Sequence, residues 1–151
     1  MKKYFVYQWD TCNISHKAEI GKNTTIHSHV SIHDNAYIGE DCQIESYVFI
    51  PNGVRIDSKS FIGPGVVFTN DPDMVAREGF KPTKTYIKSG VKIGANSTIL
   101  AGVTIGENAI IGMGSVVLED VGEGETWVGN PAKFVSAIVK YVDNPPSTKD
   151  R

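Results

Sequence analysis

Residues 14–68 read ISHKAEIGKNTTIHSHVSIHDNAYIGEDCQIESYVFIPNGVRIDSKSFIGPGVVF, and an isoleucine returns at every sixth position. Nine isoleucines keep this spacing and a phenylalanine takes the tenth place: Ile14, Ile20, Ile26, Ile32, Ile38, Ile44, Ile50, Ile56, Ile62 and Phe68. After an interruption the same spacing resumes at Ile87, Ile93, Ile99, Ile105, Ile111 and Val117. A fixed six-residue period indicates a β-helix.

A second column of residues supports this interpretation. The fourth residue after each isoleucine is small or β-branched, as at Ala18, Thr24, Val30, Ala36, Cys42 and Val48. Residues two apart on a strand share a face, so this column and the isoleucines both point inward. The third residue after each isoleucine is often Gly, Asn or Asp, which accept a positive φ at little cost. Three such hexapeptides make one triangular coil of 18 residues.

Two other folds fit the pattern poorly. A β-sandwich has strands and turns of varying length, and a six-residue period matches no α-helical stripe. The sequence therefore predicts an all-β chain, a parallel β-helix of about five coils between Ile14 and Gly122. Stacked strands lie about 4.8 Å apart in such a coil.

The length and charge of the chain exclude several classes of protein. At 151 residues, positions 1–151 are expected to form one domain. The net charge of −2 and the lack of a basic block predict no nucleic-acid or membrane-surface partner. No apolar run approaches the roughly 20 residues of a spanning helix, and the N-terminus lacks the apolar core of a signal peptide. These features predict a cytoplasmic protein, with Cys12 and Cys42 as small buried hydrophobic residues.

The two ends of the repeat are expected to be covered. Residues 1–13 are interpreted as an N-terminal cap, since a terminal coil exposes apolar area and strand edges. Residues 123–142 are predicted to form a turn and a short helix, with Asn130 as N-cap and Pro131 at the first helical position. Helical spacing then joins Phe134, Val135, Ile138, Val139 and Val142. Residues 143–151 are expected to be a disordered tail.

Residues 69–86 break the repeat and are predicted to leave the coil as an 18-residue loop. Connections of this length are uncommon in compact domains and are often functional. A flat prism face has no cleft of its own, so the loop is expected to reach over a neighbouring surface. Such contacts usually close into a symmetric ring, which predicts a homotrimer.

All four histidines precede the loop, at His16, His27, His29 and His33. On a triangular coil they fall near two corners, so three imidazoles cannot converge at about 2 Å on one metal ion. No metal site is predicted, and the histidines are interpreted as turn and surface residues. His29 and Tyr47 replace the usual Gly or Asn of the turn, which marks either a binding edge or neutral drift.

Three motifs resemble a known superfamily. The repeated hexapeptide, the run IGANSTILAGVTIG at 93–106 and the ending GNPAK at 129–133 are similar to left-handed β-helix (hexapeptide-repeat) acyltransferases. The segment FIGPGVVFTNDPD at 61–73, followed by a resumed coil, resembles N-acetyltransferases of nucleotide-linked amino sugars. These include the dTDP-3-amino-3,6-dideoxyhexose and UDP-3-amino-glucuronate enzymes, which serve cell-surface polysaccharide synthesis.

The resemblance implies a set of site residues. Asn70, the Asn of Phe-Thr-Asn, is implied to lie beside the acceptor amine. The co-substrate is implied to be acetyl-CoA, bound between two subunits of a trimer, and the second partner a nucleotide sugar. The positions matching the family's CoA site are Ala101, Gly102, Gly114, Pro131 and Lys133, and the substrate-binding candidates are His29, Glu45 and Tyr47.

The residues of the loop favour transfer to an amine. A hydroxyl acceptor needs a general base, usually His, and no histidine follows His33. An amine with a pKa near 8 is already about a tenth neutral at pH 7 and needs mainly orientation. Asn70 can orient the amine, Asp71 can take its proton, and the Gly102 N–H can support the thioester oxygen.

Two alternatives to this function stay open. The first is an O-acetyltransferase of the serine or galactoside kind, which requires His27 or His29 of a neighbouring subunit to reach the loop. The second is a non-catalytic hexapeptide scaffold subunit. A scaffold needs neither the Phe-Thr-Asn loop nor the Asn-Pro-Ala-Lys turn, so the sequence favours an enzyme.

Overall fold

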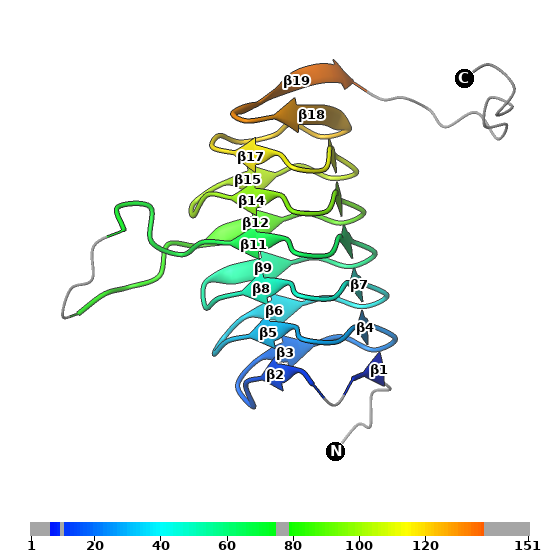
Figure 1. The fold of residues 1–151 in the computed structure, drawn as a ribbon, viewed down its shortest axis with the longest axis vertical. Helices are drawn as coiled ribbons and strands as arrows, with labels where there is room; N and C mark the ends of the chain where they lie inside the picture. Colours follow the sequence, from blue (N-terminus) through cyan, green and yellow to red (C-terminus); the bar gives the residue numbers. More distant parts are fainter. Residues whose placement is uncertain (1–6, 10, 75–78, 138–151) are drawn as a thin grey trace, which may run out of the picture.

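The computed structural model is a stack of short strands with one loop extending from its side (Figure 1). It describes residues 7–9, 11–74 and 79–137, and every regular element within these ranges is a strand. The strands form three sheets, called here sheets A, B and C, which the chain visits in rotation from β1 to β17.

Sheet A contains, in spatial order, β1 (Tyr7–Gln8), β4 (Thr25–Ile26), β7 (Gln43–Ile44), β10 (Phe61–Ile62), β13 (Lys92–Ile93), β16 (Ile110–Ile111), β18 (Glu125–Gly129) and β19 (Ala132–Ala137). Sheet B contains β2 (Asn13–Ile14), β5 (Ser31–Ile32), β8 (Phe49–Ile50), β11 (Val67–Phe68), β14 (Thr98–Ile99) and β17 (Val116–Val117). Sheet C contains β3 (Glu19–Ile20), β6 (Tyr37–Ile38), β9 (Val54–Ile56), β12 (Thr85–Ile87) and β15 (Thr104–Ile105).

Strands within a sheet pair in parallel at the predicted separation of 18 residues, as Ile26 does with Ile44 and Ile32 with Ile50. Each coil thus uses three hexapeptides, which confirms the predicted parallel β-helix. The antiparallel pair β18–β19 is the one departure from parallel pairing among the described strands. Sheet B holds one strand for each turn of the solenoid, six in all, close to the expected number of coils.

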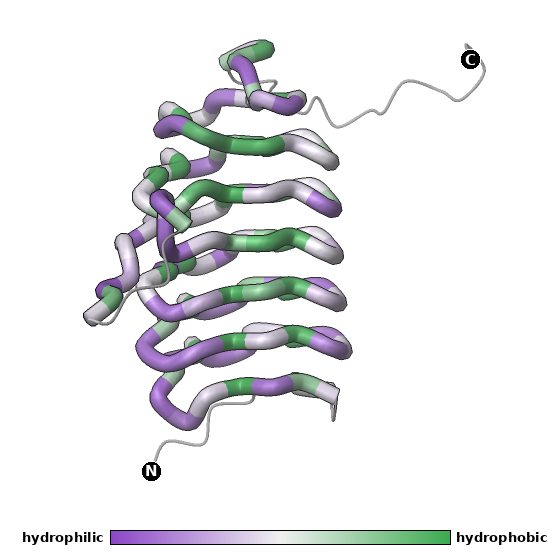
Figure 2. The backbone as a smooth tube through the Cα atoms, turned by 60° about the vertical axis from the view of Figure 1, so that its left-hand side comes forward, coloured by the Kyte–Doolittle hydropathy of each residue, from purple (hydrophilic) through white to green (hydrophobic). Residues whose placement is uncertain are grey.

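The interior consists of the two predicted columns. The isoleucines of the six-residue column from Ile26 to Ile111 are at most 1% exposed, and Val30, Ala36, Cys42 and Val48 are buried beside them. Figure 2 shows hydrophobic segments recurring from turn to turn, separated by more polar corners. Where the small column carries a hydroxyl, a turn carbonyl accepts its proton: Thr24 Oγ1 donates to Gly39 O at 2.8 Å and Ser97 Oγ to Gly94 O at 2.8 Å. Polar side chains therefore fit inside without losing hydrogen bonds.

The loop is shorter than predicted. Val67 pairs with Phe49 at a separation of 18 but with Thr98 at a separation of 31, so the loop adds 13 residues to one turn. The coil resumes at Thr85, which is fully buried on the small inward column and pairs with Val54. The predicted boundary at residue 86 was therefore wrong by two residues, because Thr85 fits that column as well as valine does.

The base of the loop is closed by backbone contacts. Thr83 N donates to Asn70 O at 2.9 Å, so the outgoing and returning segments touch. The returning segment passes beside Gly53, whose φ is 92°, and a Cβ added there would lie 3.1 Å from Thr83 O. A glycine is thus required where the loop rejoins the prism.

The predicted C-terminal helix was wrong over its described residues. β18 pairs in parallel with β16 and then turns back as β19, so residues 132–137 form a strand. The last strand of a sheet leaves unpaired N–H and C=O groups, and the hairpin satisfies them; this need outweighs the helical spacing of the apolar residues. Pro131 lies in the hairpin turn, and Phe134 and Val135 remain more than half exposed.

Some predictions fall outside the described residues. These are residues 1–6 and 10 of the N-terminal cap, residues 75–78 of the loop, the helix positions Ile138, Val139 and Val142, and the tail at 143–151. Within the described ranges, the chain has no helix with the length and hydropathy needed to cross a membrane.

Candidate active site

Asn70 lies at the corner between sheets B and C, called here the BC corner, where the loop leaves the coil. Asn52 and Asp34 occupy the same place one and two turns earlier, 18 and 36 residues before Asn70. The Asn70 Nδ2 group donates a hydrogen bond to Asn52 Oδ1. No donor in the described ranges pairs with Asn70 Oδ1, so this oxygen can accept a hydrogen from a bound molecule.

The neighbouring loop residue, Asp71, helps to shape the start of the loop. Its Oδ1 accepts the backbone N–H of Asp73 at 3.0 Å, which turns the chain immediately after Asn70. Asn70 and Asp71 are both half-buried at the same corner. The structure thus holds the two predicted catalytic residues beside each other at the base of the loop.

Two amides predicted to meet CoA lie on the next turn above and are already hydrogen-bonded. Ala101 N donates to Thr69 Oγ1 at 2.9 Å, and Gly102 N donates to Thr85 Oγ1 at 3.1 Å. Ala101 is buried and Gly102 is exposed at the BC corner. A role for the Gly102 N–H at the thioester oxygen therefore requires that it release Thr85.

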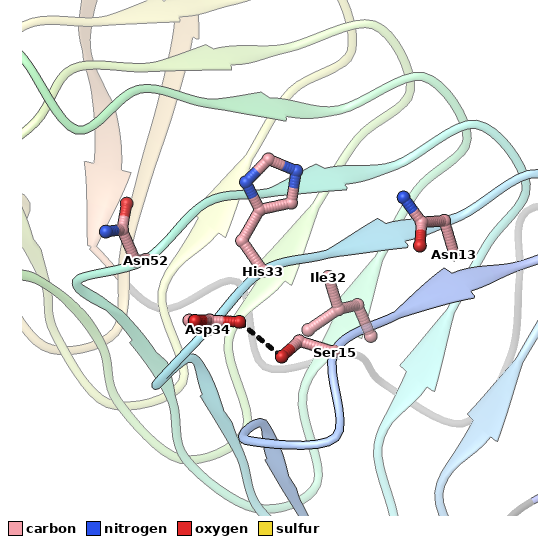
Figure 3. Close-up of a pocket in the computed structure, with 6 residues that line it drawn as sticks. All are labelled: Asn13, Ser15, Ile32, His33, Asp34 and Asn52. Carbon is pink, nitrogen blue, oxygen red and sulfur yellow. Dashed lines mark hydrogen bonds between the residues drawn. The ribbon is translucent and has the colours of Figure 1, made fainter.

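An open pocket of about 440 Å³ lies below Asn70 on the same corner (Figure 3). Its lining residues are Asn13, Ser15, Ile32, His33, Asp34 and Asn52. Asn52 joins the pocket to Asn70 through the hydrogen bond described above. Asn52 and Asp34 were not predicted as site residues, although their spacing of 18 and 36 residues from Asn70 places them below it on the same corner.

The polar groups of the pocket are organised around Asp34. Ser15 Oγ donates to Asp34 Oδ1, and Lys17 Nζ lies 2.9 Å from Asp34 Oδ2. The Ser15 hydrogen bond, followed by that from Lys17, holds the pKa of Asp34 below its usual value. His33 is exposed at the pocket, with its ring edge-on to Phe49 at a centroid distance of 5.0 Å. The pocket thus combines an ionised carboxylate with an accessible imidazole.

The predicted substrate-binding residues meet at a different corner, between sheets A and B, called here the AB corner. His29 stacks on Tyr47 with ring centroids 4.8 Å apart and planes at 12°. His27 and His29 both lie between β4 and β5, so they share this corner as predicted. His27 Nε2 lies 3.8 Å from Glu45 Oε1. The structure therefore brings His29, Glu45 and Tyr47 together, but separates them from Asn70 by the width of sheet B.

The remaining residues of the predicted CoA site lie toward the C-terminal end. Lys133 Nζ reaches the BC corner, where it lies 3.1 Å from Glu119 Oε1, and both side chains are exposed. Gly114 is exposed at the AB corner with a φ of 68°. Pro131 is exposed in the β18–β19 turn. Lys133 therefore lies above Ala101 and Asn70 along one edge, whereas Gly114 lies along another.

Across residues 7–9, 11–74 and 79–137, no three His, Cys, Asp or Glu side chains converge into a candidate metal site.

The repeats match a known family. Residues 35–70 and 84–119 match the bacterial transferase hexapeptide family. These two segments flank the loop and include the strands that position Asn52, Asn70 and Ala101. The chain therefore carries repeats of this family over 72 of its 151 residues.

Particular relatives differ in the acceptor that their names give. The chain is 32% identical over 142 residues to a serine acetyltransferase from Buchnera aphidicola subsp. Acyrthosiphon pisum (strain APS), covering 87% of this chain and 47% of the relative. It is 42% identical over 67 residues to the dTDP-3-amino-3,6-dideoxy-alpha-D-galactopyranose 3-N-acetyltransferase of Aneurinibacillus thermoaerophilus, covering 40% and 35% respectively. The chain thus spans half or less of the length of these curated relatives.

The fold is also found in a solved enzyme complex. A mutant of GDP-perosamine N-acetyltransferase from Caulobacter crescentus, in complex with CoA and GDP-perosamine, superposes with a TM-score of 0.74. The two sequences are 20% identical, and the match covers 87% of this chain and 57% of that one. At this identity the comparison establishes the shared solenoid fold.

Proposed function

We propose that this chain is an acetyl-CoA-dependent N-acetyltransferase that acts on the amine of a nucleotide-linked amino sugar. The observation that carries the proposal is the state of Asn70. Its Nδ2 is bound to Asn52, which leaves its Oδ1 as an acceptor at the mouth of the loop. An amine N–H is the complementary donor. The dTDP-amino-sugar N-acetyltransferase among the relatives supports this acceptor class.

The reaction needs orientation of the amine more than deprotonation. Asn70 Oδ1 accepts one N–H of the neutral amine, which points the nitrogen lone pair at the thioester carbonyl. The C–N bond forms, the C–S bond breaks, and CoA leaves as a thiolate. The extra proton of the nitrogen passes to Asp71 or to the departing thiolate. Holding the two reactants in place supplies several kcal/mol of the barrier reduction.

The co-substrate is proposed to follow the BC corner toward Lys133. Ala101 and Gly102 lie directly above Asn70, and Lys133 lies near Glu119 one turn higher. An ammonium group at that height suits the phosphates of CoA, while the acetyl group reaches Asn70. Gly114 and Pro131 complete the proposed set at the end of the prism. A metal ion has no part in this mechanism.

A homotrimer is proposed as the active form. The loop extends away from its own prism, so the groups that it carries need a second surface to enclose a substrate (Figure 1). Light scattering tests this directly, because the chain alone has a mass of 16.5 kDa. A monomer at micromolar concentration would contradict the trimer.

A second candidate, transfer to a hydroxyl, is favoured by one observation. His33 is exposed in the pocket that Asn52 shares with Asn70, and an imidazole is the usual base for a hydroxyl. His27 and His29, which were considered for this role, lie at the AB corner instead. The serine acetyltransferase among the relatives supports this acceptor class.

The two candidates are separated by a transfer assay. The purified chain is incubated with acetyl-CoA and matched acceptors, nucleotide-linked amino sugars and their hydroxyl counterparts, and thiol release is followed. The proposal predicts release with amines and none above background with hydroxyls. Thiol release with serine or a simple sugar alone would establish the second candidate. If none of the acceptors caused thiol release, both candidates would be contradicted.

A further inference from the structure

Two ring-bearing residues occupy backbone positions that rings rarely take. The φ angles of His29 and Tyr47 are 59° and 63°, in the left-handed region. The other described turn residues with positive φ are Gly, Asn and Asp, apart from Lys59 and Met74. An outlier of this kind costs free energy, and such residues concentrate at functional sites. The AB corner therefore holds two rings that the fold itself does not need.

The stack leaves one face of Tyr47 open. His29 covers one side of the ring, yet Tyr47 is 64% exposed. The next residue in this column, Gly65, has no side chain. Above it stands Asn96, whose Oδ1 would lie 2.3 Å from a Cβ added at Gly65. The Asn96 amide therefore occupies the space beside the Gly65 backbone. A planar ring stacked on Tyr47 would lie farther out from the coil, at the level of Gly65, because a tyrosine ring extends beyond an asparagine amide.

We infer that Tyr47, backed by His29, binds the nucleobase of the nucleotide sugar on the open face of its ring. The inference rests on the proposed function and assigns one part of the substrate to one corner. A stacked base would continue the His29–Tyr47 column at the centroid spacing of 4.8 Å that this pair already shows. Stacking on an aromatic side chain accepts any base, because every base has a π face.

The position of Gly65 connects this subsite to the reacting centre. Gly65 and Asn70 belong to the same turn and lie five residues apart, about 16 Å along an extended chain. Val67, which is exposed, faces outward between them. A nucleotide sugar is an extended ligand of comparable length, so its base can stack on Tyr47 while its amine reaches Asn70.

CoA also contains a base, and its adenine has the same chemistry. Tyr47 stands on the turn after β7, whereas Lys133 stands near Glu119 at the other end of the stack. The base that stacks on Tyr47 is therefore assigned to the sugar nucleotide.

Calorimetric titration of the full chain tests the subsite without catalysis. The probes are UDP, dTDP, GDP, inorganic pyrophosphate and CoA. Tyr47→Asn removes the ring but keeps a residue suited to a positive φ, as Asn96 shows on the same column. We expect this variant to weaken binding of at least one nucleoside diphosphate by about 5- to 150-fold. Tyr47→Phe, the matched control, should bind within about threefold of the wild type.

Other results of the same experiment would overturn the inference. The inference fails if every nucleoside diphosphate that binds the wild type binds Tyr47→Asn equally tightly, or if the wild type binds none of the three. A loss restricted to CoA would assign the subsite to adenine, and equal losses for pyrophosphate would indicate a general defect. The thermal midpoint of Tyr47→Asn should stay the same or rise; a fall with unchanged binding would make the stack merely structural.

The transfer assay separates this inference from the proposed function. If amino sugars are acetylated but Tyr47→Asn leaves nucleotide binding unchanged, the function stands and the subsite is wrong. If nucleotide binding depends on Tyr47 but no amine is acetylated, the subsite stands and the proposed reaction is wrong.

Discussion

Asn70 Nδ2 donates a hydrogen bond to Asn52 Oδ1, which lies one turn lower on the same corner. This contact determines which end of the Asn70 amide faces the mouth of the loop. With the nitrogen engaged, the oxygen is presented, and an oxygen accepts a hydrogen from an amine but cannot donate one. The pair therefore suits an acceptor group that donates a hydrogen bond, as an amine N–H or a hydroxyl O–H does, and the choice of an amine rests on its not needing a base.

The first prediction concerns Asn70 itself. Asn70→Ala should lower kcat by roughly ten- to a thousandfold without abolishing turnover, because orientation is lost while the amine remains a nucleophile. Steady-state kinetics with saturating acetyl-CoA measures the effect. Complete loss of activity in a folded variant would indicate a chemical role beyond orientation.

The second prediction concerns Asn52, a positioning residue that acts through Asn70. Asn52→Ala should lower kcat by about three- to thirtyfold, since the Asn70 amide loses its fixed orientation. Asn52→Asp retains an acceptor for Nδ2 and should recover activity to within about threefold of the wild type. The KM for acetyl-CoA should not change in either variant. Equal losses of kcat in Asn52→Ala and Asn52→Asp would show that the hydrogen bond to Asn70 Nδ2 does not determine activity.

The third prediction concerns the CoA phosphates. Lys133→Ala should raise the KM for acetyl-CoA with little change in kcat, because a remote phosphate contact contributes uniform binding. Glu119→Gln is the matched control: it removes the exposed partner that lies 3.1 Å from Lys133 Nζ, and should leave the KM unchanged or lower it. A fall in kcat at constant KM for Lys133→Ala would contradict the assignment.

The isoleucine column made the coil predictable, since each member specifies both an inward direction and the 18-residue strand register. The hairpin of β18 and β19 was not predictable from the same residues. The apolar spacing of Phe134 and Val135 fits a helix locally, and only the unpaired edge of β18 favours a strand. The place of Asn52 below Asn70 follows from the predicted 18-residue coil, but their hydrogen bond depends on side-chain orientations that the repeat does not specify.

The fourth prediction concerns Cys42, which is 2% exposed in the interior. Burial raises the pKa of its thiol, so the native chain ionises this group at a higher pH than the unfolded chain does. The stability that this difference contributes is complete below the unfolded pKa of about 8.5 and is lost as pH rises through the native value.

Thiol labelling measures this protection. In Cys12→Ser, where Cys42 is the remaining thiol, native protein at pH 8 should react at least tenfold more slowly than urea-unfolded protein. The reciprocal Cys42→Ser variant reports on the partly buried Cys12 as a control. Rapid labelling of native Cys42 would mean that the interior opens far more readily than its packing indicates.

The last prediction decides between an oriented amine and a histidine base, and the structure directs it at His33. His33 lies on the same corner as the loop, two strand spacings from Thr69, or about 9.6 Å along the axis. If the substrate amine needs only orientation, His33→Ala should keep activity within about threefold. Its profile of kcat/KM against pH should then retain a single ascending limb near pH 8, where the amine itself loses its proton.

The control for this experiment is His16→Ala, an exposed histidine on the first turn of the same corner, and replacement of all four histidines should also leave the limb in place. Circular dichroism checks that each variant is folded. If His33→Ala alone removed activity, an imidazole would be acting as the base and the orientation mechanism would be wrong. Because a hydroxyl requires such a base and an amine of pKa near 8 does not, that result would transfer the assignment to an O-acetyltransferase served by the pocket of Asn52 and Asp34.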